Sequence, residues 1–233
     1  HYTDGPLTDE QKCAAGDVNA CIILLGPVPP LQLEPEGVCS GINANFVIDV
    51  SGSVDSNELG AMKSGIQSFS SIFGTTSRYS AVKYASSTSL VTTGYVDQPS
   101  FFTTIGSMNN SGVGQYTWTE GGIQAGAPNS GNALPGRPAV MFVVTDGSPN
   151  LTFANQNNQA GFTLAQPMTW VNGAVDAINA ANNARSSYWV RVVRAGPADS
   201  NLLSAFPNAA DAQAFADAVM LRLGAGSTVV TDF

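Results

Sequence analysis

Three short segments of the sequence carry side chains with hard oxygen donors. Residues 49–53 read Asp-Val-Ser-Gly-Ser, so alternate positions offer a carboxylate and two hydroxyls. Residues 114–119, Gly-Gln-Tyr-Thr-Trp-Thr, add further hydroxyls, and residues 145–147 read Thr-Asp-Gly. Together the segments supply Asp, Ser, Ser, Thr and Asp. Oxygen ligands of this kind suit Mg²⁺, Mn²⁺ or Ca²⁺ and disfavour zinc or copper.

Both aspartates of this set are attached to apolar runs that predict buried strands. The run Phe46–Val50 contains Asp49, and the run Ala139–Thr145 is followed directly by Asp146. Continuously apolar strands are typical of a parallel sheet covered on both faces. In such sheets ligands bind beyond the carboxyl ends of the strands. We therefore expect both carboxylates at one edge of a parallel sheet.

The remaining pattern alternates strands with helices. Apolar residues recur at helical spacing in residues 59–73, 170–181 and 212–223, and shorter helices are predicted at 101–108 and 120–127. Further strands are predicted at 79–84 and 89–93, as a hairpin, and at 189–193. Asp55 with Glu58 three residues later is expected to cap the first helix rather than to form a second metal site. The pattern predicts an α/β fold with three layers, in which helices cover both faces of a doubly wound, mainly parallel sheet.

In this order and context the three segments resemble the metal-ion-dependent adhesion site of von Willebrand factor A domains, whose pattern is DxSxS, then Thr, then Asp. The resemblance covers roughly Asn45 to Leu223, and it implies a Rossmann-like fold. It also implies that Ser51, Ser53 and Thr117 bind the ion directly. Asp49 and Asp146 would then act mainly through water. Thr117 is preferred over Thr119 because its distance from Gly114 matches the family.

The resemblance further implies an extracellular adhesion or recognition module. Its protein ligand would present an acidic group to the ion, expected to be Mg²⁺ or else Ca²⁺ or Mn²⁺; a glycan ligand is possible. The alternative is a structural building block of a matrix, filament or surface appendage, in which the metal mainly stabilises the loops. Four residues near the site are candidates for a ligand-contacting rim: Trp118, Thr119, Ser148 and Asn150.

Other interpretations of these residues remain open from sequence alone. Asp49 and Asp146 could cap loops or helix starts, and Ser51 and Ser53 could be ordinary turn residues. Trp118 could frame the ligand or pack on the sheet edge. The long polar stretch 148–167 either shapes the choice of partner or is a passive insertion.

Composition excludes several classes of function. The chain has 233 residues, only 11% of them charged, and a formal net charge of -8, which disfavours nucleic-acid binding. Its apolar runs are far shorter than the roughly 20 residues that span a bilayer, so no membrane insertion is expected. The only histidine is His1, and neither a GxSxG elbow nor a phosphate-binding GxxxxGK[ST] loop occurs. We therefore expect no enzymatic activity.

The first 44 residues differ from the rest and are expected to form a Cys/Pro-rich extension packed on or capping the core, with the A domain over residues 45–233. All three cysteines, Cys13, Cys21 and Cys39, lie in this extension, which favours a disulfide in an oxidising, secreted or cell-surface setting. Which two pair stays open. The third could pair with another chain or a neighbouring domain.

The extension is also expected to contribute to the sheet. Its apolar run Ile22–Leu25 could pair as an edge strand. Near the C-terminus, Phe206–Asn208 is short and interrupted by Pro207, where a final strand would be expected. We therefore expect five strands within residues 45–233 and a sixth from the extension.

Overall fold

The computed structural model describes residues 5–156, 162–196, 199–226 and 228–231. Over this part of the chain a single six-stranded sheet has the order β3-β2-β1-β4-β5-β6. Only β3 is antiparallel, paired with β2, while the other neighbouring strands run parallel. The strands are β1 (Asn43–Asp49), β2 (Arg78–Tyr84), β3 (Thr88–Leu90), β4 (Ala139–Thr145), β5 (Trp189–Ala195) and β6 (Thr228–Thr231).

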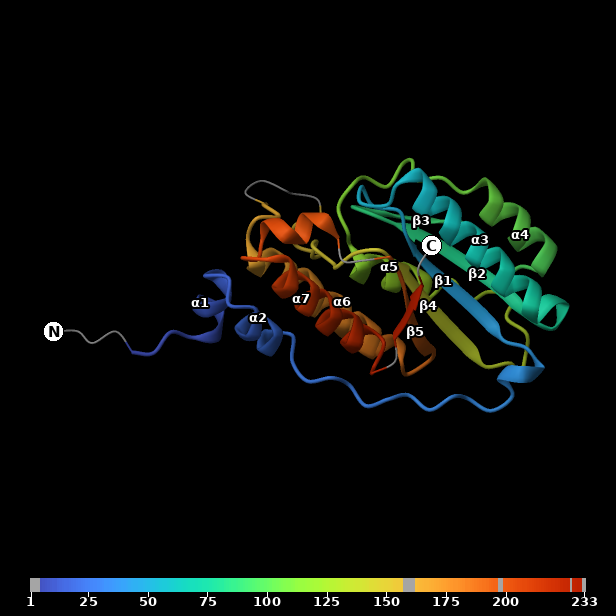
Figure 1. Cartoon of the computed structure of the whole chain (residues 1–233). Coiled ribbons are helices and arrows are strands. Elements are labelled where there is room, and N and C mark those ends of the chain that lie inside the picture. Colours follow the sequence, from blue (N-terminus) through green and yellow to red (C-terminus); the bar gives the residue numbers. More distant parts are fainter. Residues whose placement is uncertain (1–4, 157–161, 197–198, 227, 232–233) are drawn as a thin grey trace.

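Helices cover both faces of this sheet (Figure 1). On one face lie α5 (Thr119–Gly126), α6 (Pro167–Ala184) and α7 (Ala209–Leu223), and on the other lie α3 (Ser56–Phe73) and α4 (Gln98–Ser107). Successive side chains of a strand point to opposite faces, so Val47 packs with the first group while Phe46 and Ile48 pack with the second. The predicted three-layer α/β class and mainly parallel sheet are confirmed.

Helix α3 begins just after the first oxygen-rich segment and fixes where that segment ends. The Asp55 carboxylate accepts the backbone N–H groups of Asn57 and Glu58, and the Glu58 carboxylate accepts the N–H of Asp55. This is the predicted capping box. Leu59, Met62 and Ile66 are buried along one side of the helix, as their spacing predicted.

The N-terminal extension is helical where a strand was expected. It forms α1 (Asp9–Ala14) and α2 (Val18–Leu24), so the prediction of an edge strand at Ile22–Leu25 is wrong. Asp17 accepts the N–H groups of Asn19 and Ala20 and thereby starts α2. Both helices pack against α6, and α2 also packs against α7.

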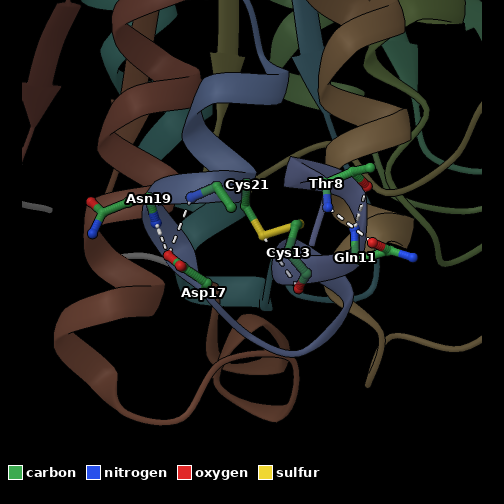
Figure 2. Close-up of a disulfide and its surroundings, with 7 residues drawn as sticks. Thr8, Gln11, Cys13, Asp17, Asn19 and Cys21 are labelled. Carbon is green, nitrogen blue, oxygen red and sulfur yellow. Dashed lines mark hydrogen bonds between the residues drawn. A yellow bond between two sulfur atoms is a disulfide. The ribbon is translucent and has the colours of Figure 1, made fainter. Parts of the chain in front are cut away.

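A disulfide between Cys13 and Cys21 joins the two short helices (Figure 2), while Cys39 is free and exposed. Both bonded cysteines are buried in the same apolar cluster as Trp170 and Phe215 of the main helices. The pairing left open by the sequence is therefore between the first two cysteines, and this bond lies within the core that the extension shares with the domain.

After α2 the chain runs along the sheet to reach β1 (Figure 1). Gln32 anchors this segment, because its Nε2 donates to the carbonyls of Arg185 and Tyr188 and its Oε1 accepts the N–H of Val190. Among the described residues, three short 3₁₀ helices complete the secondary structure: η1 (Val38–Ser40), η2 (Gly74–Thr76) and η3 (Ser200–Ser204).

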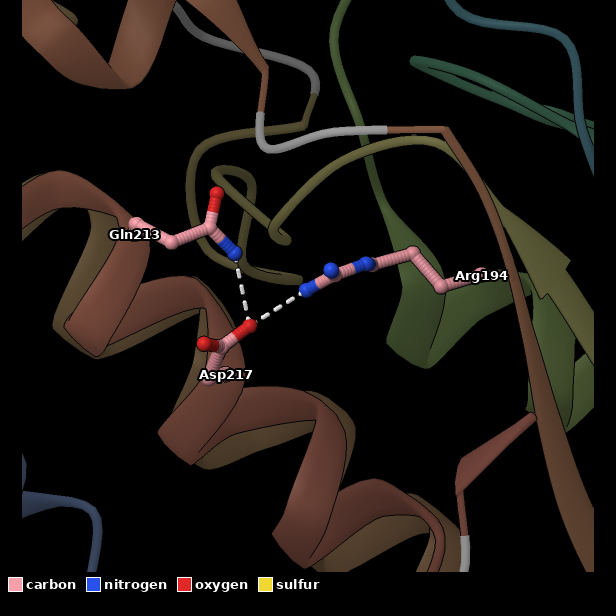
Figure 3. A network of polar contacts seen from close by, with 3 residues as sticks. All are labelled: Arg194, Gln213 and Asp217. Atoms are coloured by element: carbon pink, nitrogen blue, oxygen red, sulfur yellow. Dashed lines mark hydrogen bonds and ion pairs between the residues drawn. The ribbon is translucent and has the colours of Figure 1, made fainter. Parts of the chain in front are cut away.

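The sixth strand comes from the C-terminal end of the chain, so its predicted origin in the extension is wrong. Strand β6 follows α7 in the chain and pairs in parallel with β5. The segment 206–208 forms a bend and no strand, because Pro207 lacks an N–H and Asn208 caps α7 by accepting the N–H of Asp211. An ion pair between Arg194 of β5 and Asp217, which also accepts from Gln213, ties α7 to the sheet (Figure 3).

None of the helices in the described ranges is both long and apolar enough to cross a bilayer.

Candidate metal centre

The carboxyl ends of β1 and β4 bring the two aspartates to one place. These strands are direct parallel neighbours, with Ile48 opposite Val144, so Asp49 and Asp146 leave the sheet side by side. The hydroxyl of Ser53 donates to Asp146 Oδ1 over 3.2 Å, and it lies 3.2 Å from the hydroxyl of Ser51. The backbone N–H of Ser51 donates to Asp49 Oδ1 over 2.9 Å.

Thr117 completes the cluster from the loop that precedes α5. Its Oγ1 donates to Ser51 Oγ over 3.2 Å, whereas the hydroxyl of Thr119 lies 3.2 Å from that of Tyr84, beneath the site. The geometry therefore favours Thr117 over Thr119, as the family spacing did. One chain of hydrogen bonds connects all five residues proposed as metal ligands: Asp49, Ser51, Ser53, Thr117 and Asp146.

Backbone contacts hold the three loops together around this cluster. The N–H of Gly52 donates to the carbonyl of Gln115 over 2.7 Å, which joins the first loop to the second. The N–H of Thr117 donates to Asn150 Oδ1 over 2.9 Å, and the N–H of Asn150 returns to the carbonyl of Thr117 over 3.0 Å. The loop after β4 is thereby joined to the Thr117 loop by reciprocal hydrogen bonds.

Asp49 is held rigidly by its neighbours. It has no exposed surface, and its Oδ2 accepts a hydrogen bond of 2.6 Å from the hydroxyl of Thr145, while Oδ1 accepts the N–H of Ser51. Both carboxylate oxygens are thus engaged by protein donors. This arrangement is compatible with the indirect role that the family resemblance implies for Asp49.

The electrostatics of the cluster favour a bound cation. Burial is the main reason why the pKa of Asp49 is raised to about 6 and that of Asp146 to about 8, and the charge of Asp49 raises the pKa of Asp146 further. Two carboxylates this close are costly to ionise together without a positive charge between them. A divalent ion would supply that charge and displace the protons.

The donors present fit an oxygen-coordinated ion. Two carboxylates and three hydroxyls converge here. Within the described ranges no three His, Cys, Asp or Glu side chains cluster to hold a metal ion, so the hydroxyls would have to supply most of the side-chain ligands. In the loop that follows Asp146, the hydroxyl of Ser148 is buried without a hydrogen-bond partner. An unsatisfied buried hydroxyl is uncommon, and an ion or its water shell would satisfy it.

The four rim candidates lie deeper than expected. Trp118, Thr119, Ser148 and Asn150 are all at most 9% exposed. Asn150 binds the Thr117 backbone, Thr119 faces Tyr84, and the Nε1 of Trp118 donates to Glu120. Hydrogen bonds within the protein thus hold Asn150, Thr119 and Trp118 inward, whereas the buried hydroxyl of Ser148 has no such partner.

Three residues with a place in or beside the site were not identified from sequence. Thr145 lies under Asp49, and Phe153 lies exposed beside Trp118. Asp199 is buried, caps η3 through the N–H of Asn201, and lies so close to Gly147 that a Cβ there would be 3.4 Å from Asp199 Oδ2. Only Thr145 carried a usable signal, since it ends a buried strand next to Asp146.

The sequence matches a family model described as the von Willebrand factor type A domain over residues 45–216. The chain belongs to this family. The match begins inside β1 and ends inside α7, so it includes all three loops of the candidate metal centre of this A domain. No curated protein matches the sequence.

Solved structures with this fold come from several sources. The A domain resembles a conserved hypothetical protein, BatB, of Bacteroides thetaiotaomicron (TM-score 0.54, 16% identity, covering 82% of this chain and 91% of that one). It also resembles the von Willebrand factor domain of the type V pili tip protein Mfa5 from Porphyromonas gingivalis (0.56, 13%, covering 84% and 91%). A third is proximal thread matrix protein 1 of the mussel byssus with a zinc-occupied adhesion site (0.56, 16%).

This chain is covered to 83% by the byssus protein but spans only 42% of that protein's length. At these identities the similarity establishes the fold.

Proposed function

We propose that this A domain is a non-enzymatic recognition module that binds a protein ligand through a divalent metal ion. The ion would be held by Asp49, Ser51, Ser53, Thr117 and Asp146. The observation that supports this proposal most directly is the single hydrogen-bonded cluster that these five residues form at the carboxyl edge of the sheet. Mg²⁺ is the expected ion, with Ca²⁺ and Mn²⁺ as alternatives.

The donor set explains why such an ion would attract a partner. Three of the five donors are neutral hydroxyls, which leave more of the ion's positive charge uncompensated than carboxylates would. An ion held in this way offers a coordination position to a carboxylate on another molecule. The preferred ligand is therefore a protein that presents an Asp or Glu side chain.

Similarity to surface proteins supports an adhesive or structural role. Two of the similar structures are a pilus tip protein with a von Willebrand factor domain and a byssus thread protein with a zinc-occupied adhesion site. The disulfide between Cys13 and Cys21 favours an oxidising compartment, which supports our proposal that the domain works outside the cell, secreted or on a surface.

A screen of candidate protein ligands with and without Mg²⁺ tests the proposal. Binding is expected to require Mg²⁺, to be lost in EDTA and to be lost in the Asp49→Ala variant. Glu36→Ala is a suitable control, because Glu36 is an exposed carboxylate in the segment that precedes β1. Ligand binding that survives both EDTA and Asp49→Ala would refute the metal-dependent mode.

One observation favours a second function, that of a structural building block. Cys39 is free and exposed, so it is available to crosslink neighbouring molecules. In that case the metal would mainly stabilise the loops. Oligomers on a non-reducing gel that disappear with reductant, and that are absent in Cys39→Ser, would support this role. A chain that stays monomeric at high concentration under oxidising conditions would argue against it.

A further inference from the structure

An exposed aromatic side chain contacts the loop that carries Thr117. Phe153, in the loop after β4, has 67% of its surface exposed, and its ring centroid lies 6.3 Å from that of Trp118. Trp118 directly follows Thr117, the hydroxyl donor of the cluster. Aromatic side chains are enriched in the contact surfaces of protein interfaces, so Phe153 is available to a partner that binds at this loop.

This aromatic position is firmly supported from below. Trp118 is only 9% exposed, and its Nε1 donates to Glu120. Burial and this hydrogen bond therefore hold the ring that Phe153 contacts. The N–H groups of Asn150 and Leu151 both donate to the carbonyl of Thr117, over 3.0 and 3.2 Å. These two hydrogen bonds, together with the full burial of Leu151, connect the start of the loop that carries Phe153 to the loop that carries Thr117.

A second aromatic pair flanks Thr117 on its other side in the sequence. The rings of Tyr116 and Phe162 are 4.7 Å apart in an edge-to-face arrangement. Thr117 therefore lies between two aromatic residues in the sequence, and the ring of each contacts a ring from the segment after β4. We name Tyr116, Trp118, Phe153 and Phe162 the aromatic rim.

We propose that the aromatic rim selects peptide segments in which the metal-binding acidic residue is adjacent to an aromatic or branched aliphatic residue, with Phe153 as the main contact. This inference rests on the proposed function. The acid would bind the ion, while the neighbouring apolar side chain would cover Phe153. Aromatic residues in well-packed positions often dominate the energy of an interface.

Peptide display tests the proposal with a defined probe. Random linear peptides on phage are selected on the immobilised chain in Mn²⁺ and, in parallel, in EDTA. We expect Mn²⁺-dependent enrichment of peptides in which Asp or Glu has an apolar neighbour. Phe153→Ser should keep the enrichment for acids and lose that for the apolar neighbour, and it should bind a synthetic peptide of the enriched class about tenfold more weakly.

Two controls separate this proposal from the proposed function. Phe102→Ser changes another exposed phenylalanine, 43% exposed on α4, and should leave peptide selection unchanged. Mn²⁺ affinity measured by calorimetry should be the same in Phe153→Ser as in the parent chain.

Metal-dependent enrichment of acids with no effect of Phe153→Ser overturns the aromatic selection alone. If no peptides are enriched in a metal-dependent way, both the aromatic selection and the proposed metal-dependent recognition of a protein ligand are overturned. Selective, metal-dependent binding of acidic glycans in place of peptides would also overturn this inference.

Discussion

A methyl group added on helix α6 should disturb the metal centre from behind. Gly173 packs against the backbone of Asn150, and a Cβ at this position would lie 2.9 Å from the N, Cα and C atoms of that residue. Backbone atoms cannot move aside as the end of a side chain can. Gly173→Ala should therefore push Asn150 away from Thr117 and weaken the reciprocal hydrogen bonds that hold the metal loop.

Two opposing effects set the size of the change. Overpacking of a well-packed site costs about 1–3 kcal/mol. The replacement of glycine by alanine inside a helix returns up to about 1 kcal/mol. We expect a net loss of about 1–2 kcal/mol in the free energy of unfolding, which for a chain of this size lowers the melting temperature by about 2–8 °C. The affinity for Mg²⁺ should fall as well.

Thermal unfolding with and without Mg²⁺, together with calorimetric titration of the ion, measures both effects. Gly60→Ala is the matched control, because Gly60 also lies inside a helix, α3, and nothing would lie within 4 Å of its Cβ. That variant should be as stable as the parent chain or more stable, with unchanged Mg²⁺ affinity. If Gly173→Ala behaved like Gly60→Ala in both measurements, the proposed coupling between α6 and the metal loop would be wrong.

Three further predictions follow from the same contacts. Reduction of the Cys13–Cys21 bond should lower the free energy of unfolding by about 2 kcal/mol in denaturant titrations, equally in the parent chain and in Cys39→Ser, and an unchanged midpoint would contradict this. Thr145→Val removes the donor to Asp49 Oδ2 and should lower the free energy of unfolding of the metal-free chain by about 1–3 kcal/mol. Thr119→Val should lower it less, because the hydroxyl of Thr119 faces the neutral hydroxyl of Tyr84. Equal losses in the two variants would argue against a special role for Thr145. Because the folded chain raises the pKa of Asp49 and Asp146, it binds protons more tightly than the unfolded chain does. The stability of the metal-free chain should therefore fall as pH rises from about 4 to about 8, while the stabilisation by Mg²⁺ grows. A melting temperature of the metal-free chain that rises over this pH range would contradict the prediction.

The parts of the site that the sequence predicts are those attached to regular strands. Asp49 and Asp146 are recognisable because each is joined to an apolar run, and parallel strands deliver their carboxyl ends to one edge. The helix cap at Asp55 is equally predictable from the sequence, since the capping box depends only on local spacing.

Features that depend on tertiary contacts were out of reach. Helices α1 and α2 are too short to be stable alone and form because they pack on α6 and α7, with the disulfide between them. Their short apolar run at Ile22–Leu25 is equally compatible with a strand. The burial of Ser148 and Asn150, and the approach of Asp199 to Gly147, result from loop paths that no residue spacing encodes.

The central claim is that the hydrogen-bonded cluster at the carboxyl ends of β1 and β4 binds a divalent ion. Calorimetric titration of the metal-free chain with Mg²⁺ and with Mn²⁺ tests it most directly. The account predicts binding of a single ion, at least tenfold weaker in the Ser51→Ala, Ser53→Ala double variant, abolished in Asp49→Ala, and unchanged in Glu36→Ala. Equal binding by all four chains, or no binding by the parent chain, would contradict it.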